Sequence, residues 1–399
     1  MKAPLPDRRS SETNDDLKLP IALVLGEIDL VRALQIAGVR CALAATPGSR
    51  ARYSRGVSRV VDRVDGVEDE DRLLERLIAF AAEQAEPPVL FYDSDSDLLF
   101  ISRQRERLAD VFRFAVAEAA LVESLVDKHR FQELAAELGL PVPRSQLLSV
   151  RAGVRPDLDL PLPVVVKPLT RHADSWRSVS SSKAVYVDSR AALDDVVSSL
   201  NRHGVDAVMQ EAVPGGEERV ESYHVYVAPE NRIAGEFTGR KLRTYPPRFG
   251  YSTALVITDE PDVRELGRSV VRDLNLRGVA KLDFKRDLEG RLWLLEVNPR
   301  FNLWHHPGAV AGVNLPWLVY ADLIGAPRPR AVSARPGVTW CVLRGDYRAA
   351  RAHGLSRRDW VRFVSRCEAI SGFAWNDPAP LVKEILARAQ GRLRRAARR

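Results

Sequence analysis

The segment from residue 290 to residue 300 constrains the fold and the chemistry of this chain more than any other stretch. It reads Gly-Arg-Leu-Trp-Leu-Leu-Glu-Val-Asn-Pro-Arg, an apolar run of strand length that ends at Pro299. Proline removes a donor from a β-ladder, so the strand is expected to stop there. Side chains two residues apart on a strand leave the same face of the sheet, which places Glu296 and Asn298 together.

These two groups gain a third oxygen from Asp283, which lies on the strand-like run just before. A set of carboxylate and amide oxygens suits Mg²⁺ and therefore indicates phosphate chemistry. Arg300 follows the strand, where it could reach over a group held by the metal. The three oxygens alone also allow a plainer interpretation, in which Asp283 belongs to a hairpin, Glu296 lies on the surface and Arg300 is their ion-pair partner.

The composition is that of a soluble globular protein. The 399 residues suffice for two or three domains with their own cores, and 45% hydrophobic with 28% charged residues is ordinary. Residues 1–18 form a polar tail without the features of a signal peptide, and no apolar run approaches the ~20 residues of a membrane span. Cys41, Cys341 and Cys367 lack metal-type spacing, which favours a reducing compartment. We expect a cytoplasmic protein without a transmembrane segment.

The net charge of +7 is concentrated at one place. Six arginines and no acid fall within the last twelve residues, namely Arg388, Arg392, Arg394, Arg395, Arg398 and Arg399. A basic tail is most often a solvated helix end, and less often a contact for anionic lipid, nucleic acid or a partner. The charge therefore predicts no specific nucleic-acid partner.

Residues 19–126 are predicted to form a first α/β domain. Apolar runs at Leu19–Leu25 and Val39–Ala45 flank a stretch of helical periodicity at residues 27–37, which is the pattern of a β-α-β unit. Another strand-like run, Pro88–Tyr92, ends in Asp-Ser-Asp-Ser-Asp at residues 93–97, a polar loop of the kind found at the ligand-binding edge of a parallel sheet. No G-x-G-x-x-G segment is present, which argues against NAD or FAD.

Residues 127–325 change to a mixed α+β pattern. Residues 104–138 are predicted to be helical, with Asp127 as a cap and Gly139 as the end of the second helix. Further helices are predicted at residues 190–203, 260–275 and 308–324. The predicted strands are Pro163–Lys167, Lys183–Val187, Val205–Glu211, Tyr223–Val227, Arg232–Phe237, Leu255–Thr258, Gly278–Lys285 and Arg291–Val297.

A linker is predicted at residues 326–336, which contain three prolines. The remainder, within residues 326–399, is expected to be a small C-terminal extension that ends in the basic tail. Its chemistry cannot be inferred from the residues, and it either completes the preceding domain or binds a partner.

Cationic residues and a turn precede the acidic cluster in a fixed order. Lys128 opens a helix, and Lys167 ends an apolar strand, where its ammonium group must reach a polar partner. The strand at residues 209–211 runs into a Pro-Gly-Gly turn whose exposed backbone could bind an adenine edge. Residues 239–243, Gly-Arg-Lys-Leu-Arg, then add further cations.

This order resembles that of the ATP-grasp superfamily over about residues 20–325. The segments 127–131, 240–247 and 298–301 are similar to the carboxylate-amine ligase branch, near carbamoyl-phosphate-synthase-like and D-aspartate-ligase-like proteins. The resemblance implies an N-terminal Rossmann-like pre-ATP-grasp domain, followed by an ATP-grasp fold of two α+β subdomains and a small C-terminal extension. It also implies a set of ATP-binding residues, which covers the phosphates (Lys128, Lys167 and Lys183), the adenine (Glu211 and Val213) and the ribose (Glu218, with Glu217 and Glu221 as alternatives).

The resemblance assigns the remaining residues to metal binding and catalysis. Asp283, Glu296 and Asn298 would ligate two Mg²⁺ ions, for which Mn²⁺ could substitute. Arg300, Arg240 and Lys241 would steady the transferring phosphoryl group. This division suits phosphoryl transfer, which depends on positioning and on neutralising charge.

One stretch departs from the superfamily. The loop that covers the phosphates is usually rich in glycine, whereas the corresponding residues 171–183 are rich in serine, so its flexibility is less assured. Two other groups of residues each allow two interpretations. His305 and His306 could accept a proton from an attacking amine or pack structurally, and Asp93, Asp95 and Asp97 could contact a substrate amine or cap a helix.

These features favour an ATP-dependent ligase that activates a carboxylate as an acylphosphate and joins it to an amine, with small-molecule substrates. Carboxyphosphate chemistry and an ATP-binding protein without turnover are the alternatives. A homodimer is compatible with the sequence, which does not settle the oligomeric state.

Overall fold

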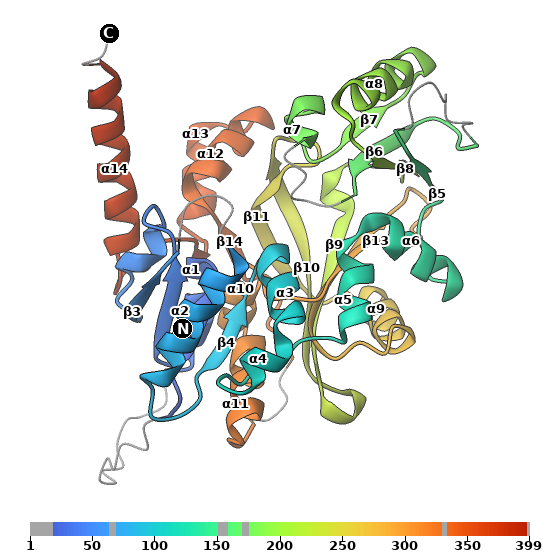
Figure 1. The fold of residues 1–399 in the computed structure, drawn as a ribbon. Coiled ribbons are helices and arrows are strands. Elements are labelled where there is room, and N and C mark those ends of the chain that lie inside the picture. The colour runs from blue at the N-terminus through green and yellow to red at the C-terminus, as the bar shows by residue number, and fades with distance from the viewer. Residues whose placement is uncertain (1–18, 64–68, 151–158, 170–174, 329–332, 397–399) are drawn as a thin grey trace.

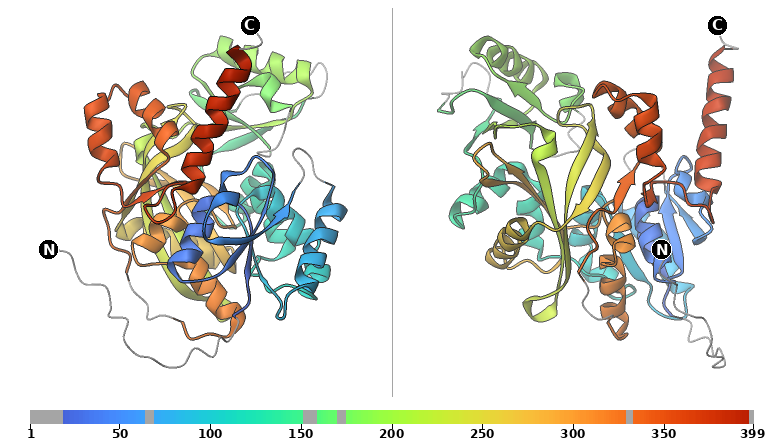
Figure 2. Two further views of the ribbon diagram at one scale, coloured as in Figure 1. Left: turned by 90° about the vertical axis from the view of Figure 1, so that its left-hand side faces the viewer. Right: turned by 180° about the vertical axis from the view of Figure 1, so that it is seen from behind.

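The structure is a computed structural model of the chain. It describes residues 19–63, 69–150, 159–169, 175–328 and 333–396, with side chains up to residue 390. The polar tail predicted at residues 1–18 lies outside these ranges, as do parts of the serine-rich stretch and of the linker. The described residues form three sheets that are surrounded by helices (Figures 1 and 2).

The N-terminal sheet is parallel and contains the expected β-α-β unit. Its strand order is β3-β2-β1-β4, and helices α1 to α3 accompany it. The elements are β1 (Ala22–Leu25), α1 (Ile28–Ile36), β2 (Cys41–Ala45), β3 (Val57–Asp62), α2 (Glu70–Ala82), β4 (Val89–Tyr92), α3 (Asp95–Arg103) and α4 (Arg105–Ala109). The edge strand β3 is not predicted by the sequence, because it is only half-buried and lacks an apolar run.

A small antiparallel sheet follows, in the order β5-β8-β6-β7. Leu193 and Leu200 of helix α8 pack in one core cluster with Val164 and Met209 of this sheet. The elements are α5 (Ala119–Val126), α6 (Lys128–Glu137), β5 (Ser145–Leu148), β6 (Val164–Pro168), α7 (Trp176–Val179), β7 (Val185–Val187), α8 (Arg190–His203) and β8 (Ala207–Glu211).

The central sheet has seven strands in the order β13-β12-β9-β10-β11-β14-β15. Its strands are β9 (Val220–Ala228), β10 (Arg232–Tyr245), β11 (Tyr251–Thr258), β12 (Gly278–Arg286), β13 (Leu292–Asn298), β14 (Thr339–Cys341) and β15 (Ala369–Ile370). The helices of this region are α9 (Pro261–Asp273), α10 (His305–Val310), α11 (Leu315–Ile324), α12 (Leu343–Ala352), α13 (Arg357–Val364) and α14 (Ala379–Ala396).

Two sequence predictions for this region need correction. The strand predicted at Arg232–Phe237 continues to Tyr245, so the basic segment 239–243 lies within β10. The helix predicted at residues 308–324 is two helices, separated at Gly312, whose φ of 103° interrupts the helix. For the C-terminal residues, the structure agrees with the alternative that they complete the preceding domain, because β14 pairs with β11 and β15 pairs with β14, so that both continue the central sheet.

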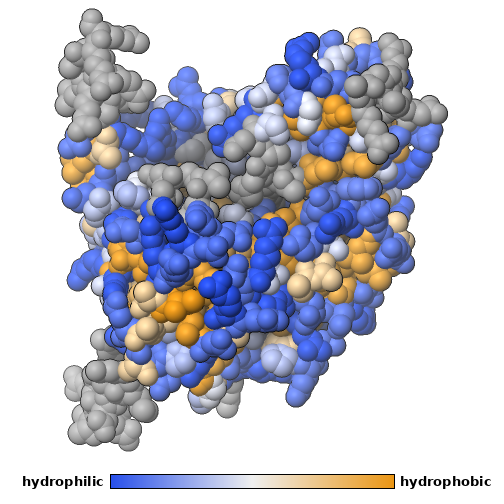
Figure 3. Space-filling model, viewed as in Figure 1, coloured by the Kyte–Doolittle hydropathy of each residue, from blue (hydrophilic) through white to orange (hydrophobic). Residues whose placement is uncertain are grey.

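The surface seen in Figure 3 is mostly hydrophilic, with hydrophobic residues in small groups. Within the described residues, no helix combines the length and the apolar character needed to cross a membrane.

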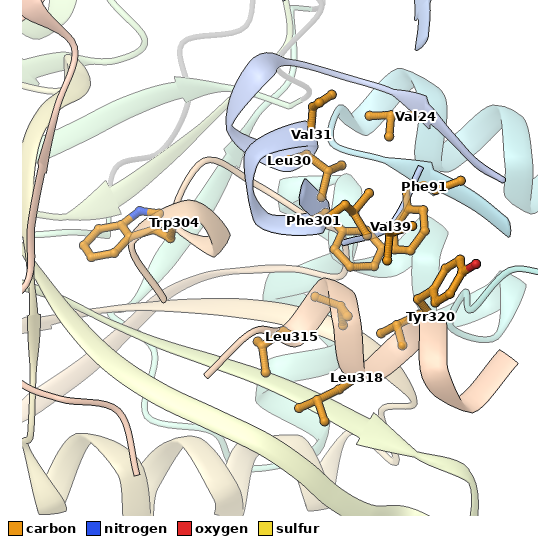
Figure 4. Packing of buried hydrophobic residues seen from close by; sticks show 14 of the residues in the cluster. Val24, Leu30, Val31, Val39, Phe91, Phe301, Trp304, Leu315, Leu318 and Tyr320 are labelled. Carbon is orange, nitrogen blue, oxygen red and sulfur yellow. The ribbon is translucent and has the colours of Figure 1, made fainter. Parts of the chain in front are cut away.

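The largest core cluster joins the N-terminal sheet to the central sheet. Leu30 of α1 and Phe91 of β4 pack in one cluster with Phe301 and Trp304, which follow β13 (Figure 4). Asp29 of α1 adds a buried polar contact, since it accepts hydrogen bonds from the Trp340 indole at 2.8 Å and from the Ser371 hydroxyl at 2.7 Å. The N-terminal sheet is thus fixed against the strand end that carries Glu296 and Asn298.

Candidate active site

A cavity of about 700 Å³ lies between the small antiparallel sheet and the central sheet. Both sheets contribute side chains to it, apolar ones such as Val165 and Val208 and charged ones such as Lys167 and Asp283. Its volume is that of a site for a small-molecule ligand or cofactor.

The predicted oxygen cluster lies in this cavity. Asp283 of β12 is directly opposite Glu296 of β13 in the antiparallel register, and Asn298 follows two residues later. Residues that are paired in register share a face, so the three side chains leave the sheet on the same side. All three line the cavity. The sequence prediction that they are neighbours agrees with this arrangement.

The donor set fits a hard divalent cation. Among the described residues, no group of three or more His, Cys, Asp or Glu side chains is suited to a metal. The oxygen cluster has two carboxylates, and its third protein oxygen is the side-chain amide oxygen of Asn298. Asn298 Oδ1, the atom that could ligate a cation, accepts a hydrogen bond from Arg300 Nη2 at 3.5 Å, and the amide nitrogen is buried without a hydrogen-bond partner in the described structure. Two carboxylates and an amide with room for further ligands suit Mg²⁺, which usually keeps several waters or substrate oxygens.

Two lysines surround Asp283. Lys281 Nζ donates to Asp283 Oδ2 at 2.6 Å, and Lys241 Nζ lies 3.9 Å from the same oxygen. Burial lowers the pKa of Lys281, and the Asp283 carboxylate opposes this effect. Lys281 is absent from the residues predicted by the sequence, although its position two residues before Asp283 would have placed it on the same face.

Two further lysines line the cavity, Lys167 on β6 of the small sheet and Lys285 on β12, two residues after Asp283. Lys167 Nζ donates to Gln210 Oε1 at 2.8 Å. Burial lowers the pKa of Lys167, and the nearby carboxylate of Glu296 opposes this effect. Burial also lowers the pKa of Lys285, and there the carboxylate of Glu217 opposes it. An anionic ligand would relieve the crowding of positive charge. Gln210 and Lys285 are also site residues that the sequence reading missed.

The other two predicted phosphate ligands also line the cavity. Lys128 is the first residue of α6, whose N-terminus Asp127 caps as predicted, and its Nζ lies 3.3 Å from the Leu169 carbonyl oxygen. Lys183 Nζ lies 3.5 Å from the ring centroid of Tyr251. Both are therefore positioned beside the cavity by side-chain or backbone contacts.

The residues predicted to bind adenine lie at the end of β8 and just after it, and those predicted to bind the ribose lie between residues 217 and 221. Glu211 and Val213 line the cavity. Glu217 also lines it, whereas Glu218 is not among the lining residues and its carboxylate lies against Gly216. Glu221 is paired with Arg286 at 2.8 Å. Of the three acids considered for the ribose, Glu217 is the one that faces the cavity.

The three predicted catalytic cations are not brought together. Lys241 lines the cavity, but Arg240 is exposed, because adjacent residues of a strand point to opposite faces. Arg300 is buried and pairs with the carboxylate of Asp95, and it donates to the Asp93 carbonyl oxygen at 2.9 Å and to Asn298 Oδ1 at 3.5 Å. Arg300 thus connects β13 to the N-terminal domain and is not among the residues that line the cavity.

The two histidines have structural contacts. His306 Nδ1 lies 2.9 Å from Asp29 Oδ1. His305 accepts a hydrogen bond from the Asn302 backbone, and burial lowers its pKa to about 3. The geometry therefore favours packing over proton transfer for both residues.

Comparisons with known proteins show what this chain is similar to. A family model described as "ATP-grasp in the biosynthetic pathway with Ter operon" matches residues 238–344. D-aspartate ligase from Enterococcus faecium is 23% identical over 68% of this chain and 68% of that enzyme. D-alanine–D-alanine ligase from Chromohalobacter salexigens is 29% identical over 43% of this chain and 54% of that enzyme. The match therefore spans about half of that enzyme's length.

The fold is also found among solved structures. N5-carboxyaminoimidazole synthetase from Staphylococcus aureus, complexed with ADP, superposes with a TM-score of 0.60 at 13% identity, over 80% of this chain and 81% of that protein. The resemblance and the fold class expected from the sequence are thereby confirmed.

Proposed function

We propose that this chain, which has the ATP-grasp fold, is an ATP-dependent ligase that activates a carboxylate as an acylphosphate and joins it to an amine. The observation that carries the proposal is the pairing of Asp283 with Glu296 in the lining of a cavity that Lys167 and Lys241 also line. This arrangement can hold a polyphosphate between cations and a metal site.

ATP would lie along the cavity. The adenine would lie against Val213 and Glu211, and Glu217 would contact the ribose. Lys128 and Lys167 would bind the α and β phosphates, with Lys183 as a further phosphate ligand. This assignment is supported by their common location around one cavity of the described structure.

Magnesium would be held by Asp283, Glu296 and Asn298. When bound, it supplies positive charge that neutralises the phosphate oxygens during phosphoryl transfer. Mn²⁺, which prefers similar oxygen ligands, would serve as a substitute.

The protein's own contribution is to hold the reacting groups and to neutralise their charge. A carboxylate oxygen of the acid attacks the γ phosphorus, the bond to the β–γ bridging oxygen breaks, and ADP leaves. The amine then attacks the acyl carbon, the bond from that carbon to the phosphate oxygen breaks, and the proton lost by the nitrogen passes to the departing phosphate, which gives an amide. Lys241, which lines the cavity, would stabilise negative charge on the transferring group, and Lys281 would act through its contact with Asp283. Arg300 would act as a positioning residue for Asp95, which lines the cavity at the N-terminal domain.

Carboxyphosphate chemistry is the second candidate, because the N5-carboxyaminoimidazole synthetase structure shares the fold. Both candidates imply small-molecule substrates, and the use of ATP agrees with the cytoplasmic location expected from the sequence. The two differ in the acid that receives the phosphoryl group.

The test is ADP release from Mg-ATP by the purified protein, with pairs of amino acids or small carboxylates and with bicarbonate alone. Release that needs one organic acid and one amine supports the ligase, whereas release that needs bicarbonate supports the second candidate. Glu296→Ala should abolish release. Glu289→Ala, an exposed acid in the turn between β12 and β13, is the matched control and should retain it. Tight ATP binding without turnover on any pair would contradict both reactions.

A further inference from the structure

Helix α14 carries an exposed apolar stripe. Val382, Ile385 and Leu386 are 48%, 58% and 51% exposed, and their spacing places them on one face of the helix. Ala389 continues the same face. The helix projects from the body of the molecule, and hydrophobic atoms are visible on it at the upper left of Figure 3 (Figures 1 and 3).

The contacts that hold α14 use its polar face. Glu384 pairs with Arg50, and Lys383 Nζ lies 5.1 Å from the ring centroid of Tyr53, both in the short helix Arg50–Tyr53. Successive residues of an α-helix are 100° apart, so Glu384 lies on the side opposite the centre of the apolar stripe. The anchoring contacts therefore leave the stripe directed away from the N-terminal domain.

The charge around the stripe selects the occupant. The last twelve residues contain six arginines and no acid, so a second copy of the helix would bring like charges together. An anionic lipid surface satisfies both features, because its interior accepts the apolar side chains and its headgroups attract the arginines. Long arginine side chains can reach the headgroups while their stems cover apolar surface.

We propose that α14 is a peripheral binding site for an anionic membrane surface. The helix lies along the interface with Val382, Ile385 and Leu386 directed into the lipid. This function is independent of the proposed ligase reaction, since α14 contributes no residue to the lining of the cavity.

The experiment is co-sedimentation of the full chain with phosphatidylcholine vesicles that contain or lack phosphatidylglycerol. Binding to the anionic vesicles should be at least about tenfold tighter and should weaken with added salt. Ile385→Glu should reduce it to the level of neutral vesicles. The control, Leu288→Glu, changes a residue that is 62% exposed in the turn after β12, and it should bind as the unaltered chain does. Equal melting temperatures would show that both variants are folded.

Three results would overturn the proposal. The first is equal binding to the two kinds of vesicle. The second is undiminished binding of Ile385→Glu, which would mean that charge alone drives the association. The third is a dimer in sedimentation equilibrium without vesicles that Ile385→Glu dissociates, which would identify a second copy as the occupant of the stripe.

Discussion

The buried ion pair between Arg243 and Asp346 should be one of the strongest stabilising contacts between the central sheet and the C-terminal helices. The guanidinium of Arg243 on β10 donates to both oxygens of Asp346 on α12, at 2.7 Å each. Asp346 is fully buried and also accepts hydrogen bonds from Thr253 and Trp360, both at 3.1 Å. Asp346→Ala would leave the buried guanidinium without its counter-charge, which should lower the free energy of unfolding by about 3–5 kcal/mol.

The measurement is urea unfolding followed by circular dichroism. Asp194→Ala is the matched control, because it removes a surface pair with Arg190 whose side chains are about half exposed, and it should cost less than about 1 kcal/mol. The double variant Arg243→Met, Asp346→Leu should recover part of the loss, since it leaves no unpaired charge. A loss for Asp346→Ala no larger than that of the control would refute the conclusion that α12 is an integral part of the central domain.

Three further predictions concern single residues. Lys241→Met should lower kcat for ADP release at least about 100-fold. Arg240→Met is the control, because Arg240 lies on the other face of β10, and it should leave kcat unchanged. Equal losses of kcat would contradict the conclusion that only Lys241 faces the cavity. Burial raises the pKa of Asp93 to about 7, so the native state holds a proton that the unfolded chain loses near pH 4, and stability falls as the pH rises from about 4 to 7. Asp93→Asn should therefore gain more stability over the unaltered chain at about pH 8 than at about pH 5, in urea unfolding at the two values. Gly239→Ala would place a Cβ 2.4 Å from the Trp304 ring and should lower the free energy of unfolding by about 1–3 kcal/mol, again measured with urea.

Local patterns predicted the elements that carry the site. Asp127 was identifiable as a cap from its position before a helical pattern, and its carboxylate accepts hydrogen bonds from the backbone of His129 and Arg130. The alternation of a strand predicted that Glu296 and Asn298 share a face, and the register of β12 with β13 adds Asp283 to them. These predictions succeeded because they depend on residues that are close in the sequence.

The roles of individual cations were harder to predict. The sequence predicted the same role for Arg240 and Lys241. Strand β10 extends through both residues, so their side chains point to opposite faces of the sheet. Arg300 has the position expected of a residue that contacts the metal site, and its guanidinium does donate to Asn298 Oδ1 at 3.5 Å, but it also pairs with Asp95, which is 205 residues earlier. No pattern along the chain reports a contact at that separation.

The sequence by itself determined the parallel N-terminal unit, the strand pair that carries Asp283 and Glu296, and the superfamily that this order of residues resembles. Only the tertiary structure decided that the C-terminal residues complete the central sheet, because β14 and β15 have three and two residues and show no periodicity of their own. It also decided which side chains line the cavity. Burial and the pairing of charges depend on elements that are distant in the sequence and become neighbours only when the chain is folded.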